Sequence, residues 1–457
     1  MIFTIYIPGW LRWAGTPALL LAVFAMTGCR GVPAAGEDQA RQQVKDVTGI
    51  YRLEDKPAPL PTLTVNSGLA DYLFFAMLNH PVPEAAYYDW VASVENITIT
   101  RSRPDPQFTF QAYITDRLTS LMPGLNWSIP GRGKLAARGR VATEASKGKY
   151  FAFESAVQQT AFNLKSSYYK LSLVEEQIRL NQETMSLLDH SERVTRALSQ
   201  SGQATFPDVL RVQSDIDRIR NGLADLEDSR QLLLANFKAA LGLTPGQPDP
   251  PLPARFEMGD QNFAPDDLWR VALESNPQLK AMAAEVRTTE AGIAEAYKDR
   301  TPDFNAGLQA EVYEPPFFWP QAGMTLPIWR DKLAAEVAQA KANELAARSR
   351  LTSAQIDLAV SFAEKAFTYR ETSRDLALIE DKLAPKVQQT IELIRAGYRA
   401  GTSDYSSLTD AERMLLTLKL EAAEARTQRA IALADLSLMV AGVPPPGAPL
   451  LSKAPQP

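Results

Sequence analysis

The chain has 457 residues, a formal net charge of −5 at pH 7 and one cysteine, Cys29. The nearly balanced charge argues against a nucleic-acid-binding protein and against a strongly acidic tail protein. A single cysteine excludes an intramolecular disulfide. Length alone would suggest about three or four domains, but two copies of one extended unit fit the sequence better.

The N-terminus has the pattern of an export signal. Arg12 precedes an apolar run at residues 18–25, which is too short to span a membrane as a helix and is typical of a signal-peptide core. Gly28 and Cys29 follow it in a stretch that resembles a bacterial lipoprotein signal. We therefore expect a signal peptide at residues 1–28 and lipidation, such as palmitate, on Cys29. The alternative is ordinary cleavage near Gly28 with a free thiol left over.

The next segment predicts a tether followed by two short helices. Residues 29–66 contain several prolines and no sustained periodicity, so we expect a lipidated N-terminal tether there. Helices are expected at 69–78 and at about 83–96. Their counterparts in the second half of the chain are expected at 266–275 and 277–298.

Two pairs of alternating segments predict the strands, at about 106–130 and about 303–328. Apolar and polar residues alternate along them, as in strands with one apolar and one polar face. The first strand of each pair has apolar residues at Phe108, Phe110, Ala112 and Ile114, and at Phe304, Ala306, Leu308, Ala310 and Val312. Strands of about ten residues can cross a bilayer at a tilt. The alternative, a soluble sheet with one face on a core, lacks separate helices of suitable size to cover it.

Four strands cannot close a barrel. Open strand edges are not tolerated in lipid, because unpaired backbone groups there cost several kcal/mol each. Since single-chain membrane barrels begin at about eight strands, a cyclic oligomer of at least two chains is expected.

A long helical hairpin is predicted at about 134–242. Its first leg contains no proline from Lys134 to Ser201 and could reach about 100 Å at 1.5 Å per residue. Gly139 and Gly148 weaken the helical pattern near its beginning. Apolar residues at seven-residue spacing indicate a coiled-coil seam; these are Leu164, Leu171, Ile178 and Met185.

A second hairpin is predicted at about 332–442. A stripe of apolar residues spaced by three or four runs up its first leg, at Leu376, Ile379, Leu383, Val387, Ile391, Ile394 and Tyr398. Pro385 should kink or divide this leg near Leu383. The returning leg is rich in strong helix formers.

The two halves repeat each other at an offset of about 200 residues. Gly202 matches Gly401, and Phe206 matches Tyr405. We therefore divide the chain into repeat 1 at 67–245 and repeat 2 at 266–442. The remaining segments are a linker at 246–265 and a proline-rich, disordered tail at 443–457.

This order of elements resembles the TolC-type outer-membrane efflux proteins, also called outer-membrane factors, in their lipoprotein branch. The similarity covers about 67–442, and its most telling marks are the duplicated tip turns and the Leu326-Pro327-Ile328 strand end before a long helix. It implies a mainly α-helical fold with a membrane β-barrel portion and an internal twofold repeat. In a homotrimer, twelve strands would form an outer-membrane barrel and the helical hairpins a periplasmic α-barrel.

The resemblance also implies function. The chain would be the outer-membrane channel of a tripartite efflux or export system, with a periplasmic adaptor and an inner-membrane transporter as partners and outer-membrane lipid around it. The adaptor would contact the hairpin tips: Gly202, Gln203 and Phe206, and Gly401, Thr402, Ser403, Asp404, Tyr405 and Ser406.

A periplasmic aperture is expected near the same tips. By the resemblance, Asp208 and Asp410 match lumen-facing carboxylates, while Ser407 occupies a second such position. A ring of aspartates across a narrow passage favours cations. The alternative is that both carboxylates only stabilise the N-terminal ends of their helices.

Other functions have less support. His80 and His190 are the only histidines, and the sequence has neither a Cys/His metal cluster nor a phosphate-binding glycine loop. We expect no catalysis, metal or cofactor. The basic run 132–149 fits solvated residues at a barrel-to-helix junction better than a site for nucleic acid or anionic lipid. The main alternative is a non-conducting periplasmic coiled-coil lipoprotein that acts as a spacer or adaptor.

Overall fold

The computed structural model describes residues 32–51, 59–114, 118–202, 205–257, 268–311, 317–399 and 405–440. It divides into two compact units. The strand unit comprises residues 1–42, 91–147 and 284–348, and the hairpin unit comprises residues 43–90, 148–283 and 349–457, each within the described ranges. The expected signal peptide, Cys29 and the tail lie outside the described residues.

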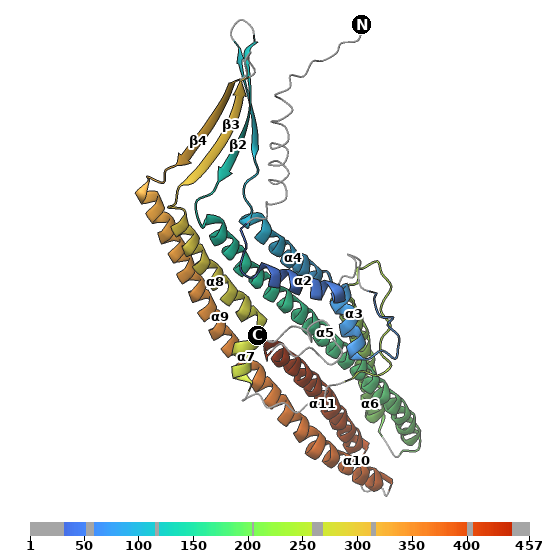
Figure 1. Cartoon of the computed structure of the whole chain (residues 1–457). Helices are drawn as coiled ribbons and strands as arrows, with labels where there is room; N and C mark the ends of the chain where they lie inside the picture. Colours follow the sequence, from blue (N-terminus) through green and yellow to red (C-terminus); the bar gives the residue numbers. More distant parts are fainter. Residues whose placement is uncertain are drawn as a thin grey trace, which may run out of the picture. The chain divides into compact units, whose positions relative to one another are not determined.

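The fold is mainly α-helical (Figure 1). The helices are α2 (Glu37–Tyr51), α3 (Leu69–Asn79), α4 (Pro81–Arg101), α5 (Lys134–Gln200), α6 (Phe206–Ala240), α7 (Trp269–Ser275), α8 (Pro277–Lys298), α9 (Arg330–Leu378), α10 (Ala384–Arg399) and α11 (Tyr405–Val440). A π-helical segment, η3 (Ile379–Leu383), joins α9 to α10. The strands are β1 (Gln107–Ile114), β2 (Leu118–Ile129), β3 (Asp303–Glu311) and β4 (Phe317–Thr325).

The strands form one antiparallel sheet in the order β1-β2-β3-β4. In this sheet β2, β3 and β4 lie side by side (Figure 1). The register confirms the two predicted faces: Phe108, Leu125 and Leu308 are aligned on one, and Asn126, Gly307 and Gln321 on the other. Both outer edges, β1 and β4, are unpaired within the described chain.

Helix α2 lies in the segment for which the sequence suggested a tether, and the sequence analysis missed it. Its first residue, Glu37, is 5% exposed and accepts hydrogen bonds from Thr98 and Arg101 on α4. Arg41 of α2 also bonds to Glu37. Gly139 of α5 allows close approach here, because a Cβ at that position would lie 3.3 Å from the Cβ of Arg101. The beginning of α2 is thus fixed by a buried polar network.

Helix α4 is longer than expected. The sequence suggested a helix at 83–96 followed by an extended segment, whereas α4 begins at Pro81 and continues to Arg101. Thr100 and Ser102 donate their hydroxyl groups to backbone carbonyls one turn earlier. The hydroxyl groups at this end of α4 thus bond to the helix backbone itself.

The first hairpin, α5 and α6, has its core in the hairpin unit. Helix α5 is continuous across Gly148, and its predicted seam is confirmed at Leu164, Leu171 and Ile178, which are buried, while Met185 is half-buried. Phe237 of α6 and Tyr72 of α3 pack in the same core, their ring centroids 5.4 Å apart.

The predicted interruption of the second hairpin near Leu383 is confirmed, and η3 is its form. Within η3 the N–H of Ala384 bonds to Ile379 O, five residues back. Pro385 has no N–H to donate, which favours such a local change in helix geometry. The π turn also breaks the predicted apolar stripe: Leu376, Ile379 and Ile391 are buried, whereas Leu383 is exposed.

Equivalent hydrogen bonds join the ends of the short helices α3 and α7 to the ends of the returning helices α6 and α11. Asn79 Nδ2 donates to Leu241 O at 3.0 Å, and Asn276 Nδ2 donates to Met439 O at 3.3 Å. Helix α6 ends in a Schellman motif at Gly242, which has φ +75°. The internal repeat is thus visible in specific contacts as well as in the order of elements.

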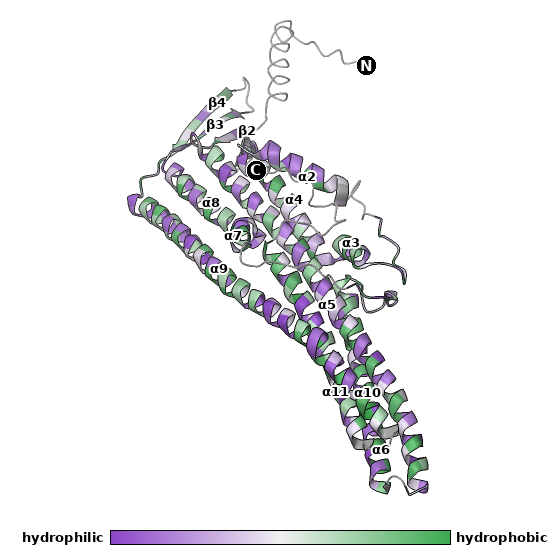
Figure 2. Cartoon of the chain, turned by 90° about the horizontal axis from the view of Figure 1, so that it is seen from below, coloured by the Kyte–Doolittle hydropathy of each residue, from purple (hydrophilic) through white to green (hydrophobic). Residues whose placement is uncertain are grey.

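Hydrophobic and hydrophilic residues are interleaved along the long helices, as Figure 2 shows for α9. Among the described residues, no helix has both the length and the apolar character to cross a membrane.

Candidate functional site

The tip of the first hairpin is an exposed glycine turn. Gly202 has φ +76°, and a Cβ at this position would contact nothing within 4 Å. Phe206, the first residue of α6, is 65% exposed. Gln203 lies outside the described residues. The tip therefore presents a large apolar side chain beside a turn that only glycine adopts easily.

Asp208 serves as a helix-capping residue. Its Oδ2 accepts hydrogen bonds from the backbone N–H of Thr205, at 3.0 Å, and from the Thr205 hydroxyl, at 2.6 Å. Together they form a capping box at the beginning of α6. The capping role, which the sequence offered as the alternative for this carboxylate, is therefore observed, and the side chain is half-buried.

The second tip is described only from Tyr405 onward. Gly401, Thr402, Ser403 and Asp404 lie outside the described residues. Tyr405 and Ser406 begin α11, and the structure does not describe their side chains.

The two candidate aperture positions on α11 are exposed. Ser407 is the third residue of α11, the position that Asp208 occupies in α6. Asp410 lies one turn further along, with its side chain 72% exposed and 3.8 Å from Arg413. The structure therefore places a hydroxyl and a carboxylate on successive turns of this helix.

Ion pairs connect the helices just behind these tips. Arg413 of α11 donates to Asp215 of α6, and so joins the two hairpins. Arg395 of α10 donates to Glu412 of α11 at 3.2 Å. Sequence reasoning missed this cluster, because only the fold brings residues 215 and 413 together; the available signal was the density of charged residues beside each tip.

A cavity of about 430 Å³ lies between the two hairpins. Apolar side chains, including Leu188, Ile219 and Ile391, line it together with the paired Asp215 and Arg413. Near the tips the hairpins are thus in contact through polar groups, with incomplete packing between them, whereas further from the tips Ala430 and Ala434 of α11 pack in the same apolar core as Phe237 of α6.

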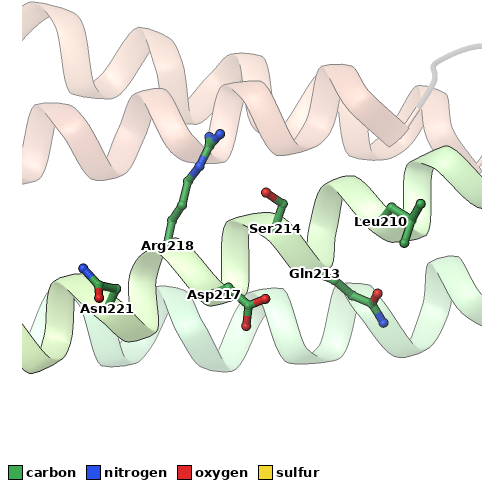
Figure 3. A pocket seen from close by; sticks show the side chains of 6 residues that line it. All are labelled: Leu210, Gln213, Ser214, Asp217, Arg218 and Asn221. Atoms are coloured by element: carbon green, nitrogen blue, oxygen red, sulfur yellow. The ribbon is translucent and has the colours of Figure 1, made fainter.

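An open groove of about 630 Å³ follows α6 beside this cavity. In Figure 3, Arg218 and Ser214 point toward the helices of the second hairpin, while Gln213 points toward α5. Gln213 donates to Glu192 of α5 at 2.9 Å. An ion pair with Arg196 holds the pKa of the Glu192 carboxyl below its usual range.

The described residues contain no group of three or more His, Cys, Asp or Glu side chains that could hold a metal ion. The features that the site does offer are a glycine turn, a capping carboxylate at the beginning of α6, an exposed carboxylate in the second turn of α11 and an inter-hairpin ion-pair cluster. These suit a contact surface and a charged passage.

Comparisons with known proteins agree on the class. The outer membrane efflux protein family matches residues 84–243 and 268–442, which correspond to the two halves of the repeat. The chain belongs to this family, whose members are transport channels. No curated protein sequence matches it significantly.

Solved structures show the same fold at low sequence identity. A membrane protein from Pseudomonas aeruginosa is 17% identical with a TM-score of 0.71, over 83% of this chain and 91% of that one. The CmeC outer membrane channel of Campylobacter jejuni is 13% identical with a TM-score of 0.69, over 83% and 88%. The open-state MtrE outer membrane channel of Neisseria gonorrhoeae is 15% identical with a TM-score of 0.68, over 84% and 93%.

Proposed function

We propose that this protein is the outer-membrane channel of a tripartite efflux or export system. It would receive substrate from an inner-membrane transporter through a periplasmic adaptor and release it outside the cell. Family membership and the duplicated unit of two amphipathic strands and a helical hairpin support this proposal.

The open sheet carries the argument for a shared barrel. Its apolar face suits lipid and its polar face suits water, but β1 and β4 leave unpaired backbone groups at both edges. In lipid such edges must be paired. Three chains would supply twelve strands in one barrel, with each β1 pairing to the β4 of a neighbour.

Exposed apolar side chains on α9 support the same assembly. Ile356, Phe367 and Leu378 are 60%, 53% and 45% exposed. Their spacing of eleven residues equals three helical turns, so they lie along one side of the helix. An apolar side that is open in one chain suits contact with another copy.

The hairpin tips are the proposed adaptor contact and aperture. Phe206 and the Gly202 turn would contact the adaptor, together with residues 401–406. Asp410, and to a lesser degree Asp208, would supply negative charge to the passage and favour cations there. We propose that the resting channel is closed by contacts between the hairpins, including the Asp215–Arg413 pair. Lipidation of Cys29 would add an anchor to the barrel.

Conductance in planar bilayers, with the oligomer mass measured in parallel, tests this function. We expect a trimer with small, cation-selective currents. Asp410→Ala should weaken the cation preference, with Asp208→Ala having the smaller effect because Thr205 already engages that carboxylate. A monomer that never conducts would support the non-conducting spacer instead.

A further inference from the structure

The four strands are almost free of charge. Their described residues include two charged side chains, Asp303 and Glu311, which are the first and last residues of β3. Asp303 is already engaged, since Lys134 Nζ donates to it at 2.9 Å. The polar face between these two positions consists of amides, hydroxyls, glycines, a methionine and aromatic residues.

Three glutamines on this face form a directional chain of hydrogen bonds. Gln321 Nε2 donates to Gln309 Oε1 at 2.7 Å, and Gln309 Nε2 donates to Gln111 Oε1 at 2.9 Å. The second bond passes over β2 at Gly124, where a Cβ would come 3.5 Å from Gln309 Cγ and 2.7 Å from Thr109 Oγ1. Gln309 is only 8% exposed, so this central amide is buried with both its oxygen and its nitrogen engaged.

The two ends of this hydrogen-bond chain are complementary, and they lie on the two open edges of the sheet. Gln111 on β1 retains its Nε2 donor, and Gln321 on β4 retains its Oε1 acceptor; within the described chain neither atom has a partner. Both residues are exposed. A second copy of this chain, placed with its β4 beside β1, would bring the missing acceptor to the free donor.

The glutamine hydrogen bonds cross the sheet at a slope that matches the tilt of strands in a barrel. Following the paired residues straight across the sheet from Gln321 on β4 leads to Gln107 on β1. Gln111 lies four residues beyond Gln107 along β1. Strands tilted by about 35–45°, spaced about 4.8 Å with a rise of about 3.3 Å per residue, shift by about 3–4 residues over three steps. The three amides would therefore lie at about one height along the axis of a barrel.

We propose that Gln111 of each chain donates to Gln321 of its neighbour, so that the glutamines close into a continuous, uncharged amide ring inside the shared barrel. The inference rests on the proposed function, because it needs a closed barrel of several chains. The occupant of each sheet edge is then a second copy of this chain. Because each amide of the ring donates one hydrogen bond and accepts one, the ring is held in place by its own bonds and adds no fixed charge to the passage.

Disulfide crosslinking of the full-length protein tests the ring. Within one chain, β1 and β4 are three strand spacings apart, about 14 Å, which is beyond the reach of a disulfide. The double variant Gln111→Cys/Gln321→Cys should therefore form crosslinked dimers and trimers on mild oxidation. The matched control is Gln107→Cys/Gln321→Cys, whose first cysteine lies four residues away on the same strand and should crosslink poorly. The single variants Gln111→Cys and Gln321→Cys show whether either introduced cysteine forms a disulfide with the native Cys29.

A second variant tests the role of the central amide. Gln309→Met keeps the length of the side chain and removes both hydrogen bonds, so the trimer should dissociate at a lower temperature in detergent. A conducting trimer in which only the control pair crosslinks, or neither pair does, would overturn the ring and leave the channel intact. A protein that neither conducts nor forms trimers would overturn the channel proposal itself.

Discussion

Arg413 on α11 donates a hydrogen bond from Nη2 to Asp215 Oδ2 on α6, so one ion pair joins the two halves of the repeat close to their tips. The carboxylate is the more buried partner, with its side chain 13% exposed. The cavity between the hairpins lies against this pair. Because packing there is incomplete, the pair should contribute appreciably to the contact between the hairpins.

Asp215→Asn should therefore ease opening of the tip. A partly exposed ion pair contributes about 1 kcal/mol or less, which would raise the open fraction of the channel at most about fivefold. Single-channel recording measures this fraction. Asp217→Asn is the matched control, because Asp217 pairs with Arg220 on its own helix. Equal behaviour of the two variants would rule out a role for the 215–413 pair in closure.

The buried network at the beginning of α2 should make stability depend on pH. Hydrogen bonding from Arg101 lowers the pKa of Glu37 to about 2, against an ordinary value of 4.5. Ionised Glu37 thus stabilises the fold above about pH 4.5, and this contribution is lost as the pH falls toward 2.

Glu37→Gln should lower the free energy of unfolding by about 2 kcal/mol at neutral pH. The difference from the wild-type protein should shrink below pH 4.5, which denaturant unfolding at several pH values would measure. The neighbouring, exposed Asp38 provides the control Asp38→Asn. A difference that stays constant down to pH 2 would contradict the assigned role.

Gly242 should be intolerant of any side chain. Its φ of +75° disfavours other residues, and a Cβ there would lie 2.7 Å from the Cα of His80. Gly242→Ala should therefore destabilise the fold by more than about 1 kcal/mol. Gly222, inside α6, has nothing within 4 Å of a Cβ, so Gly222→Ala should stabilise by up to about 1 kcal/mol. Thermal unfolding of both variants should give shifts of opposite sign.

The exposed apolar side of α9 should affect assembly rather than the fold of one chain. Phe367→Glu would place a charge in the proposed contact between subunits, and we expect a larger fraction of monomer by mass photometry in detergent. Helix content measured by circular dichroism should not change. Gln355→Glu, at another exposed position of α9, is the control. A fully trimeric Phe367→Glu protein would exclude this face from the interface.

Patterns local in sequence predicted the regular elements well. The strand faces, the seam of Leu164, Leu171 and Ile178, and the interruption before Pro385 all depend on spacing along one segment. Helix α2 was missed because its stability depends on Glu37 reaching Thr98 and Arg101, which lie some sixty residues away.

The candidate site shows the same division. Asp208 was singled out by the resemblance, with helix capping as the alternative, and the capping bonds are as local as the helix-start pattern that suggested them. The inter-hairpin pair and the glutamine chain join residues nearly two hundred positions apart. No spacing rule along the sequence reports such contacts.

The sheet also constrains the order of folding. The β1–β2 and β3–β4 ladders each join neighbouring segments, whereas the central ladder pairs Gly124 with Gln309, and the whole first helical hairpin and the linker lie between these two residues. Closing so long a loop is slow compared with forming a local hairpin. Each half of the repeat can thus form its own strand pair early, before the two pairs meet. Until the β2–β3 ladder forms, the chain exposes four unpaired strand edges instead of two. This interval is when the chain most needs protection from aggregation during its passage to the membrane.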